Sequence, residues 1–453
     1  MDWINDVLSK ASDVVWGVPL LVLLVGTGLY LTFRLGFLQF RSLGYALKLS
    51  FTKKHQDKAS DGDISHYQAL TTAMAATIGT GNIAGVATAV VLGGPGAVFW
   101  MWMTALVGMA TKYAEALLAV KYRVQGKDGT MSGGPMYYLE RGLNAKWLGI
   151  LFAVFGAVAA FGIGNMVQSN SVSDVLGENF NVPGWATGAV LAVLAGLVII
   201  GGIKSIGRVT AFFVPIMAAL YLLGGIIILI ANFDLVPAAL GLIFTDAFTG
   251  EAVAGGAIGA VIRYGVARGL FSNEAGLGSA PIAAAAAKTD YPARQALVSM
   301  TQVLIDTIIV CSVTGITIVM AGSEFFAGGY EGADLTSVAF GHFLGDFGSY
   351  IVAIGLVFFA FSTLLGWSYY GEKCFNYLTN ERGLMGYRVV FIGLIMVGAI
   401  AELQTVWVFA DVMNGLMAFP NLIGLIGLAG VVVAETKRFS SVAKEERRRA
   451  KAS

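Results

Sequence analysis

The residues of this chain best suited to binding chemistry are small and polar, and they interrupt two long apolar stretches. Residues 77–82 read Thr-Ile-Gly-Thr-Gly-Asn within an apolar run from about 67 to 92. Residues 269–278 interrupt a second run, from about 252 to 287. Hydrocarbon offers unwound backbone no hydrogen bonds, so such breaks persist in a membrane only where they line a cavity. A pair of broken helices is typical of the binding site of a secondary transporter.

The glycines of the first break, Gly79 and Gly81, lower the cost of leaving helical geometry. The N–H groups of Thr80 and Gly81 then begin a second half-helix. The positive end of a helix dipole favours an anion such as a carboxylate. We therefore expect Gly79, Thr80 and Gly81 to bind a substrate.

The end of the first half-helix has the opposite polarity. Carbonyl oxygens freed from Ala75, Thr77 and Ile78 carry partial negative charge and suit a cation. The Asn82 side chain can add a further oxygen. Close packing of helices through small residues is the alternative explanation of this segment.

The second break combines an aromatic wall with hydroxyl, amide and carboxylate oxygens, contributed by Phe271, Ser272, Asn273 and Glu274. We expect the first three of these residues to bind substrate. An ionisable residue within a membrane segment is a functional hypothesis by default, and Glu274 is such a residue. A structural ion pair of Glu274 with Arg268 or Arg263 is the alternative.

Polar side chains also occur in two other apolar segments. Gln168 could reach a bound ligand from the segment that contains it. Ser362 and Thr363 could bind a cation, or their hydroxyl groups could bond back to their own helix.

Four further ionisable residues lie within apolar segments. Lys112 and Glu115 are three residues apart on one helix face, and we expect them to form a structural pair. Asp306 and Asp411 have no partner in the sequence, so a cation relay and a role in helix packing both remain open.

The composition is that of a polytopic membrane protein. Of the 453 residues, 57% are hydrophobic and 13% are charged, where a soluble domain has about 25% charged residues. A transmembrane helix needs about 20 apolar residues. Eleven segments approach or meet this length: 14–33, 67–92, 97–120, 148–170, 184–203, 209–231, 252–287, 296–321, 349–371, 387–401 and 405–434. We expect an all-α membrane protein with eleven transmembrane helices, of which the second and seventh are broken.

Basic and acidic loops alternate along the chain. Lys and Arg gather in 34–66, 121–147, 204–208, 288–294, 373–388 and the tail after 434. Asp and Glu occur without Lys or Arg in 171–183, 232–251, 322–348 and 402–404. By the positive-inside rule, the basic loops and the C-terminus are cytoplasmic and the N-terminus is outside.

The two broken segments are five spans apart, so they cross the membrane in opposite directions. Spans two to six and seven to eleven therefore form two inverted five-helix repeats, a layout typical of transporters with a site near the bilayer midplane. The expected organisation is an N-terminal span with a linker, a first repeat, a second repeat and a basic tail: 1–66, 67–231, 252–434 and 435–453.

Several functions are excluded by missing motifs. The chain has no HExxH, GxSxG or Walker A motif, so we expect neither an enzyme nor an ATP-driven pump. Cys311 and Cys374 lie on different segments, without the spacing of a disulfide or a metal site. We expect no cofactor and no nucleic-acid partner, and transport driven by an ion gradient.

Three motifs resemble those of the alanine or glycine:cation symporter family. They are Gly-Gly-Pro-Gly at 93–96 followed by Phe-Trp-Met-Trp at 99–102, Ser-Gly-Gly-Pro-Met-Tyr-Tyr at 132–138, and Arg-Gly-Leu-Phe-Ser-Asn-Glu-Ala-Gly at 268–276. The resemblance implies the leucine-transporter fold and sodium-driven uptake of alanine and glycine across the cell membrane. It also implies that sodium binds Ser362 and Thr363 together with the carbonyl groups of Ala75 and Ile78. By the same resemblance, a second sodium would bind near Thr77 and Asn82.

We therefore expect a symporter of small neutral amino acids that works by alternating access. The substrate carboxylate would bind the N–H groups of Thr80 and Gly81, and its amino group would bind oxygens of the second break together with Gln168. Sodium would favour the conformer that binds substrate, because a ligand shifts an equilibrium through its differential affinity. One alternative is a proton-coupled symporter that uses Glu274 or Asp306. The other is an ion channel.

Overall fold

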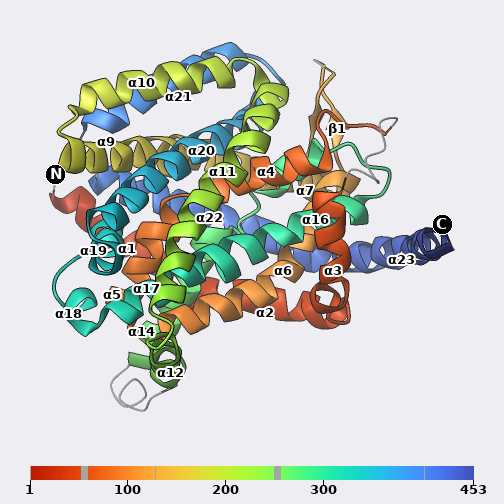
Figure 1. Cartoon of the computed structure of the whole chain (residues 1–453). Helices are drawn as coiled ribbons and strands as arrows, with labels where there is room; N and C mark the ends of the chain where they lie inside the picture. Colours follow the sequence, from red (N-terminus) through yellow and green to blue (C-terminus); the bar gives the residue numbers. More distant parts are fainter. Residues whose placement is uncertain (1, 53–59, 128, 249–256, 402–403, 453) are drawn as a thin grey trace.

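The computed structural model of the chain describes residues 2–52, 60–127, 129–248, 257–401 and 404–452 and is almost entirely helical (Figure 1). In this part of the chain the strands are β1 (Val124–Gln125) and β2 (Met131–Ser132), which pair antiparallel as a short hairpin. Five of the loop charges considered above lie outside the described residues, namely Lys53, Lys54, Lys58, Glu251 and Glu402. The start of the seventh predicted span, 252–256, also lies outside them.

The helices of the N-terminal half are α1 (Asp2–Val15), α2 (Val18–Arg34), α3 (Leu38–Phe51), α4 (His66–Thr77), α5 (Val86–Gly93), α6 (Ala97–Lys121), α7 (Pro135–Leu143), α8 (Lys146–Phe161), α9 (Val167–Phe180), α10 (Gly184–Ile199) and α11 (Gly202–Ala231). The helices of the C-terminal half are α12 (Val236–Asp246), α14 (Ala257–Asn273), α15 (Pro281–Ala285), α16 (Pro292–Val303), α17 (Ser312–Ala321), α18 (Ser323–Phe326), α19 (Gly332–Leu344), α20 (Asp346–Thr379), α21 (Leu384–Ile400), α22 (Gln404–Gly427) and α23 (Ala429–Ala452). Three π-helical stretches join neighbouring helices: η2 (Gly81–Gly85), η3 (Gly162–Met166) and η4 (Leu304–Cys311).

Seven of these helical segments are long and apolar enough to cross a membrane, and an eighth candidate is a bent pair. The pair is α4 with η2 and α5, bent by 55° at the first break. These eight correspond to predicted spans one to four, six, eight, nine and eleven. The helices at spans five and ten, α10 and α21, are apolar but shorter than the other spans. The chain is therefore a multi-pass helical protein, and the count of eleven stays a prediction.

Four segments that the sequence presented as loops contain helices, which corrects that expectation. They contain α3, α7, α12, and α18 with α19. All of these helices are too short to span a membrane. α12 is an apolar helix of 11 residues, whereas α7 buries a single face. In α7, for example, Pro135 occupies the first turn, Met136 and Tyr138 are buried, and Asn144 ends the helix in the left-handed conformation.

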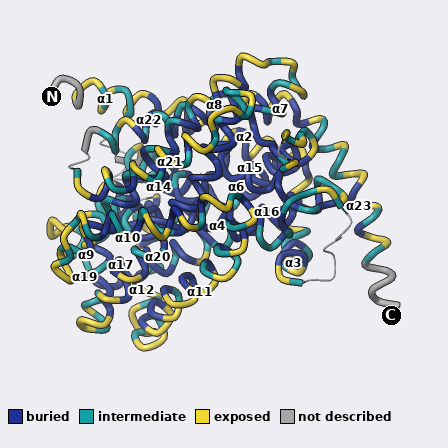
Figure 2. Tube along the Cα trace, turned by 90° about the horizontal axis from the view of Figure 1, so that it is seen from above, coloured by how far each residue is buried: buried dark blue, intermediate teal, exposed yellow. Residues whose placement is uncertain are grey.

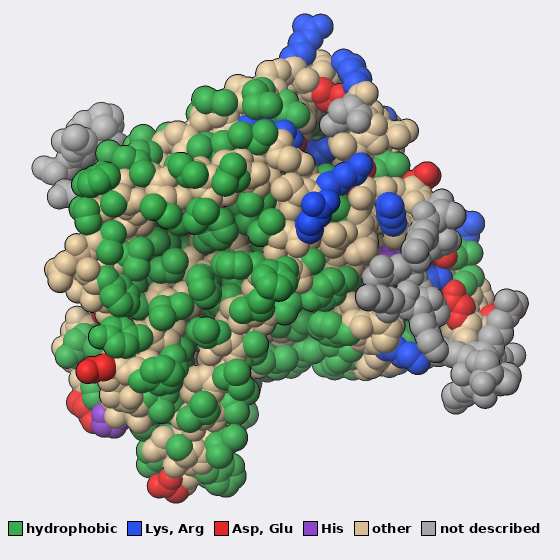
Figure 3. Space-filling view, turned by 45° about the horizontal axis from the view of Figure 1, so that its top comes forward, with side chains coloured by type: hydrophobic (Ala, Val, Ile, Leu, Met, Phe, Trp, Pro, Cys, Tyr) green, Lys and Arg blue, Asp and Glu red, His purple; other side chains and the backbone are tan. Residues whose placement is uncertain are grey.

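The buried interior and the apolar exterior are both extensive. In Figure 2, α6 lies within the buried centre, whereas α23 projects from the body with many exposed residues. Hydrophobic side chains cover most of the face in Figure 3, and the visible Lys and Arg gather toward one side. Leu197 on α10 and Phe212 on α11 are each 73% exposed, which in water would be costly. We infer that these helices face lipid.

Candidate functional site

The first break is a short non-helical step between two half-helices. α4 ends at Thr77, and Ile78 leaves helical geometry with φ −77° and ψ 91°. The Gly79 N–H donates to Asn82 Oδ1 at 2.9 Å, so the Asn82 side chain spans the step. The helix then resumes with Thr80 and Gly81, whose N–H groups have no preceding turn to supply carbonyl partners.

The second break begins later than the sequence indicated, because α14 continues to Asn273. Its backbone takes positive φ at Glu274 (55°), Gly276 (94°) and Gly278 (88°) before α15 starts at Pro281. Two of these positions are glycines, for which this conformation carries no steric cost.

Side chains from α6 and α22 satisfy the unwound backbone of the second break. Lys112 Nζ donates to the Glu274 carbonyl at 3.0 Å, and the Gly276 N–H donates to Glu115 Oε1 at 3.0 Å. Asn421 Nδ2 donates to the same Glu115 oxygen at 2.7 Å. The structural pair expected of Lys112 and Glu115 is present at 3.9 Å, and it also supports the break.

The ion pair of Glu274 with an arginine is not found among the described residues, which corrects that alternative. Arg263 pairs with Asp13 at 2.7 Å, and the Arg268 guanidinium lies 5.8 Å from the centre of the Phe271 ring. Glu274 is nevertheless buried, with 3% of its surface exposed.

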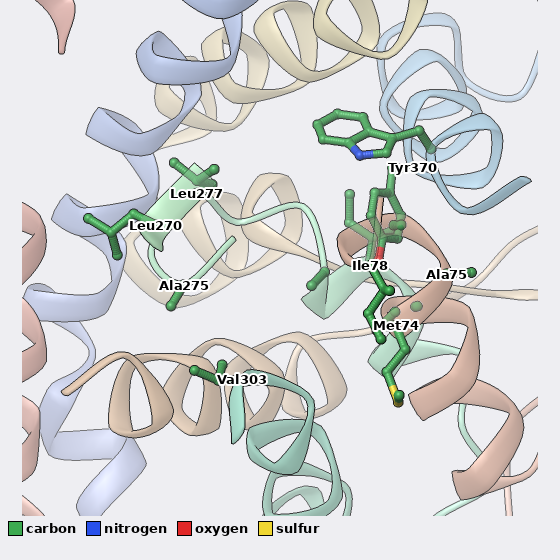
Figure 4. Packing of buried hydrophobic residues seen from close by; sticks show 14 of the residues in the cluster. Met74, Ala75, Ile78, Leu270, Ala275, Leu277, Val303 and Tyr370 are labelled. Carbon is green, nitrogen blue, oxygen red and sulfur yellow. The ribbon is translucent and has the colours of Figure 1, made fainter. Parts of the chain in front are cut away.

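The two breaks approach each other closely. A Cβ atom at Gly81 would lie 3.3 Å from Ser272 Cα and 3.4 Å from the Phe271 ring. Figure 4 shows the apolar packing around this region, with Met74, Ala75 and Ile78 near the first break and Leu270, Ala275 and Leu277 near the second.

A small cavity of about 20 Å³, room for about one water-sized probe, lies between the breaks. Seven predicted site residues line it: Thr77, Gly79, Thr80, Gly81, Gln168, Phe271 and Thr363. Glu274 lines it as well. Four further lining residues were not anticipated, namely Ala76, Ile163, Trp367 and Asn414.

Ser272 and Asn273 are not among the lining residues, although both were expected to bind substrate. Ser272 Oγ donates to Asp306 Oδ2 at 2.9 Å, and Asn273 Nδ2 donates to Thr307 Oγ1 at 3.1 Å. Both side chains thus hold α14 against η4.

Two buried amide oxygens that belong to cavity-lining residues have no hydrogen-bond partner in the described part of the chain. They are Gln168 Oε1 and Asn414 Oδ1. The nitrogen of the Gln168 amide already has hydrogen-bond partners: Nε2 donates to the Ile163 carbonyl at 3.0 Å and to Thr80 Oγ1 at 3.3 Å. A buried acceptor without a donor costs about 1–3 kcal/mol. A ligand that brings N–H groups into the cavity would remove that cost.

The predicted sodium ligands converge where α20 crosses the end of α4. Ser362 Oγ lies 3.2 Å from the Ala75 carbonyl oxygen. A Cβ atom at Gly79 would lie 2.5 Å from Thr363 Oγ1, so a glycine is needed there. Ser362 and Thr363 both also donate to the Phe359 carbonyl, at 2.8 and 2.9 Å. Carbonyl and hydroxyl oxygens of this kind suit a hard cation.

A separate polar network joins the first break to η4. Asn82 Nδ2 donates to Asp306 Oδ1 at 2.8 Å, and Thr307 Oγ1 donates to Asp306 Oδ2 at 2.7 Å. Thr77 Oγ1 bonds back to the Ala73 carbonyl of its own helix at 3.1 Å. The Thr77 hydroxyl oxygen donates in this bond and keeps its lone pairs for a cation, as Ser362 and Thr363 do, whereas Asn82 Oδ1 already accepts from the Gly79 N–H.

Asp411 lines a cavity of about 130 Å³ together with Arg268 and Phe271 of the second broken segment. Ser12 Oγ donates to Asp411 Oδ2 at 3.1 Å, so this carboxylate contacts the N-terminal helix.

A wider cavity of about 310 Å³ adjoins the site on the side of the acidic loops. It shares Thr80, Gly81 and Phe271 with the small cavity. Its charged lining residues are Asp174, Glu178, Arg268, Glu331 and Asp334. Phe271 thus lies where the wide cavity and the small one meet.

The opposite side is closed by backbone pairing between the chain before α4 and the chain after α15. The Ile64 N–H donates to the Ala286 carbonyl at 3.2 Å, and the Lys288 N–H donates to the Ile64 carbonyl at 2.7 Å. Arg123 donates to three carbonyl groups around this pairing, those of Ala285 (3.0 Å), Ala287 (2.7 Å) and Asp61 (2.8 Å). Burial lowers the pKa of Arg123, and the nearby carboxylates of Asp61 and Asp63 oppose that shift.

Over its whole length, residues 1–453, the chain matches a family described as the sodium:alanine symporter family. It belongs to this family. Sodium:alanine symporters are transporters and not enzymes. A relative from Methanococcus maripaludis, named sodium/alanine symporter AgcS, is 58% identical over 456 residues, covering 99% of this chain and 100% of the relative. A Bacillus subtilis relative named probable sodium/glutamine symporter GlnT is 38% identical, covering 96% of this chain and 91% of the relative.

Solved structures establish the fold of this sodium:alanine symporter family member. The crystal structure of MhsT in complex with L-phenylalanine superposes with a TM-score of 0.57 over 83% of this chain and 98% of that chain. At 16% identity the likeness concerns the fold alone. The leucine-transporter fold expected from the resemblance is therefore confirmed.

The cavity-lining residues missed in the sequence carry little local signal. Trp367 and Ile163 are apolar residues in apolar runs, and only the three-dimensional packing brings them to the breaks. A Cβ atom at Gly164 would lie 2.2 Å from the Trp367 side chain, so a glycine opposite a large aromatic marks this contact. Asn414 is different, because an amide inside an apolar helix is itself a signal.

Proposed function

We propose that the protein takes up alanine and glycine together with sodium by alternating access. The observation that supports this most is the small cavity between the two breaks, where the start of a half-helix and two amide oxygens without a partner among the described residues line one space. An α-amino acid carries groups of matching chemistry, a carboxylate and an ammonium, on the same carbon.

In this proposal the substrate carboxylate binds the N–H groups of Thr80 and Gly81. Its ammonium group donates to Gln168 Oε1 and Asn414 Oδ1, in place of the oxygens of Ser272 and Asn273 that the sequence suggested. Phe271 and the Trp367 side chain limit the length of the substrate side chain, because the cavity is small. The cavity has room for about one water, so binding of alanine or glycine would require the walls to move outward, and leucine would require a larger movement.

Sodium would bind the carbonyl groups of Ala75 and Ile78 and the hydroxyl groups of Ser362 and Thr363. It would join α4 to α20 and so favour the conformer in which the first break is shaped for substrate. The second sodium near Thr77 and Asn82 would share Asn82 Oδ1 with the Gly79 N–H, and it stays a prediction.

We further propose the predicted orientation, in the cell membrane, with the N-terminus outside and the C-terminus in the cytoplasm. The wide acidic cavity would then face outward, and the pairing held by Arg123 would close the cytoplasmic side. Spans two to six and seven to eleven would be the two inverted repeats whose relative rocking alternates access.

A proton-coupled symporter is the second candidate function. Asp306 and Glu274 are buried carboxylates, and no Lys or Arg side chain forms an ion pair with either of them in the described part of the chain. Burial of a carboxylate favours its neutral form. Either group could therefore carry a proton between the two sides.

Uptake by purified protein in proteoliposomes separates these functions. We expect an inward sodium gradient at equal pH to accumulate alanine, glycine to compete, and a pH gradient without sodium to accumulate nothing. Ethylamine and methylamine, which lack the carboxylate, should neither accumulate nor compete. Accumulation that follows pH and ignores sodium would establish the proton-coupled function, and a flux that neither saturates nor accumulates would establish a channel.

A further inference from the structure

The largest cavity described here lies far from the two breaks, between α2, α3 and α23. Its volume is about 520 Å³. Four cationic side chains line it, those of Arg34, Arg41, Lys437 and Lys444, and no acidic residue is among its lining residues. The hydroxyl groups of Ser42 and Ser440 belong to the same lining.

The four cations have no acidic partner among the described residues. No ion pair of Arg34, Arg41, Lys437 or Lys444 is found in that part of the chain. Arg41 does make one hydrogen bond, from Nη2 to the Leu35 carbonyl at 3.0 Å, which holds its guanidinium at the cavity. A concentration of like charge is unfavourable by itself, so the cavity favours an anionic ligand.

The floor of this cavity is apolar, in contrast to its charged rim. Leu35 and Leu38 line it from the α2–α3 corner, Leu297 from α16, and Val433 from α23. The Tyr113 hydroxyl closes one side through a hydrogen bond with Thr436 Oγ1 of 2.9 Å. A small hydrated anion would gain nothing from contact with these apolar side chains, whereas the apolar part of a lipid would.

The cavity lies at the end of the predicted spans, where the protein would meet the lipid headgroups. Arg34 is the last residue of α2, which ends a predicted span, and α23 continues directly from the last span. Three aromatic side chains at the α2–α3 corner are exposed: Phe33 (65%), Phe37 (45%) and Phe40 (50%). Their rings form a row, with centroids 5.3 Å apart for Phe33 and Phe37 and 6.4 Å apart for Phe37 and Phe40. Exposed aromatics beside cations are typical of a surface at the lipid headgroups.

We propose that this cavity binds the headgroup of an anionic phospholipid from the leaflet on the basic side of the protein. The phosphate would lie among Arg34, Arg41, Lys437 and Lys444, as in other basic pockets at this depth. The acyl chains would cover the row of Phe33, Phe37 and Phe40. The lipid would thereby join the end of the first span to the C-terminal helix.

The test is lipid binding by the full-length protein, purified in a neutral detergent and followed by native mass spectrometry. Phosphatidylglycerol is the probe, and phosphatidylcholine and inorganic phosphate are the comparison ligands. The variant combines Arg34→Gln, Arg41→Gln, Lys437→Gln and Lys444→Gln. The matched control combines Arg141→Gln, Lys204→Gln, Arg208→Gln and Arg382→Gln, which remove the same charge from exposed positions elsewhere.

We expect phosphatidylglycerol to bind the unaltered protein and the control, and to raise their thermal midpoints, with phosphatidylcholine binding much more weakly. Each basic side chain near a membrane surface contributes about 1 kcal/mol, so affinity should fall about fivefold per charge removed.

The variant without lipid should keep its thermal midpoint, because the ion pair of Arg294 with Glu446 that holds α23 is untouched. Equal loss in variant and control, or equal binding of phosphatidylcholine, would overturn the proposal. Binding of inorganic phosphate as tight as that of the lipid would assign the cavity to a soluble anion instead.

Discussion

The hydroxyl group of Thr363 occupies the point at which α20 meets the first break. It lies so close to Gly79 that only a residue without a side chain fits opposite it. Among the described residues, the hydroxyl donates to the Phe359 carbonyl of its own helix, 2.9 Å away, a bond that any helical threonine can make. The geometry therefore permits both a packing role and a role as a cation ligand. Only the second role predicts that substitution of Thr363 changes the dependence of uptake on sodium.

Thr363→Ala should raise the sodium concentration needed for half-maximal alanine uptake by about fivefold, since loss of one hydrogen-bonding oxygen costs about 1 kcal/mol. Alanine affinity at saturating sodium should change little. The measurement is uptake against sodium concentration. Thr379→Ala is the matched control, because its hydroxyl makes the same bond to the Phe375 carbonyl, also at 2.9 Å, at the end of α20. A sodium curve unchanged in Thr363→Ala would assign Thr363 to packing.

Gln168→Met should weaken alanine binding about fivefold to a hundredfold, because it removes the unpaired oxygen offered to the ammonium group. Gln39→Met is the control: Gln39 is also buried, has an unpaired Oε1, and donates through Nε2 to Thr32 Oγ1 and the Leu106 carbonyl. Binding of labelled alanine at saturating sodium and the thermal midpoint of both variants are the measurements. An equal loss of alanine binding in both variants would show a general effect on the fold and not a contact with substrate.

At the scale of elements, both broken helices were predictable because glycines and polar residues interrupt apolar runs. The limits of the second break were not, since Phe271, Ser272 and Asn273 remain helical until Glu274 turns the backbone. No local pattern in the sequence reveals which face of α14 is turned toward Asp306 and which toward the cavity. The short helices such as α7 were missed because a single buried face over two turns resembles a polar loop in a membrane sequence.

Ile64 pairs with Ala286 and Lys288 through backbone hydrogen bonds, and Arg123 donates to the Ala287 carbonyl beside them. In the proposed orientation this pairing would close the cytoplasmic side of the site. Arg123→Gln should weaken it and shift the protein toward a conformer open on that side. A cysteine introduced by Ala287→Cys should then react faster with a thiol reagent supplied from the basic side, because Ala287 is fully buried here.

The control for this shift is Arg141→Gln, which removes the same charge from an exposed position. The two native cysteines, Cys311 and Cys374, are buried and should contribute little to labelling. Faster labelling in the control as well, or none in either variant, would contradict a clamping role for Arg123.

At the scale of the whole molecule, the family and the fold are shown, and the orientation rests on loop charge. A membrane-impermeant thiol reagent should label Lys127→Cys only from the cytoplasm and Glu331→Cys only from outside, because these positions lie in a basic and an acidic loop. Arg382→Cys should behave as Lys127→Cys does. Labelling of Lys127→Cys and Glu331→Cys from the same side would contradict the inverted repeats, since it changes the parity of the spans between them.

The length of α20 has a mechanical consequence. Its 34 residues extend about 51 Å at 1.5 Å per residue, well beyond a hydrocarbon core of about 30 Å. Ser362 and Thr363 stand at its midpoint, and near them Gly366 packs so closely that its Cβ would lie 2.7 Å from Ala76 Cβ. The contact of α20 with the first break is therefore near the middle of the helix, so the helix can tilt about this contact. A tilt of about 10° there would carry its two ends about 4 Å in opposite directions, given the same rise per residue. Near one of those ends, Lys373 donates to Thr130 and Ser132 of the β1–β2 region at 3.0 and 2.9 Å. A small rearrangement at the first break would therefore move residues at both surfaces of the membrane at once.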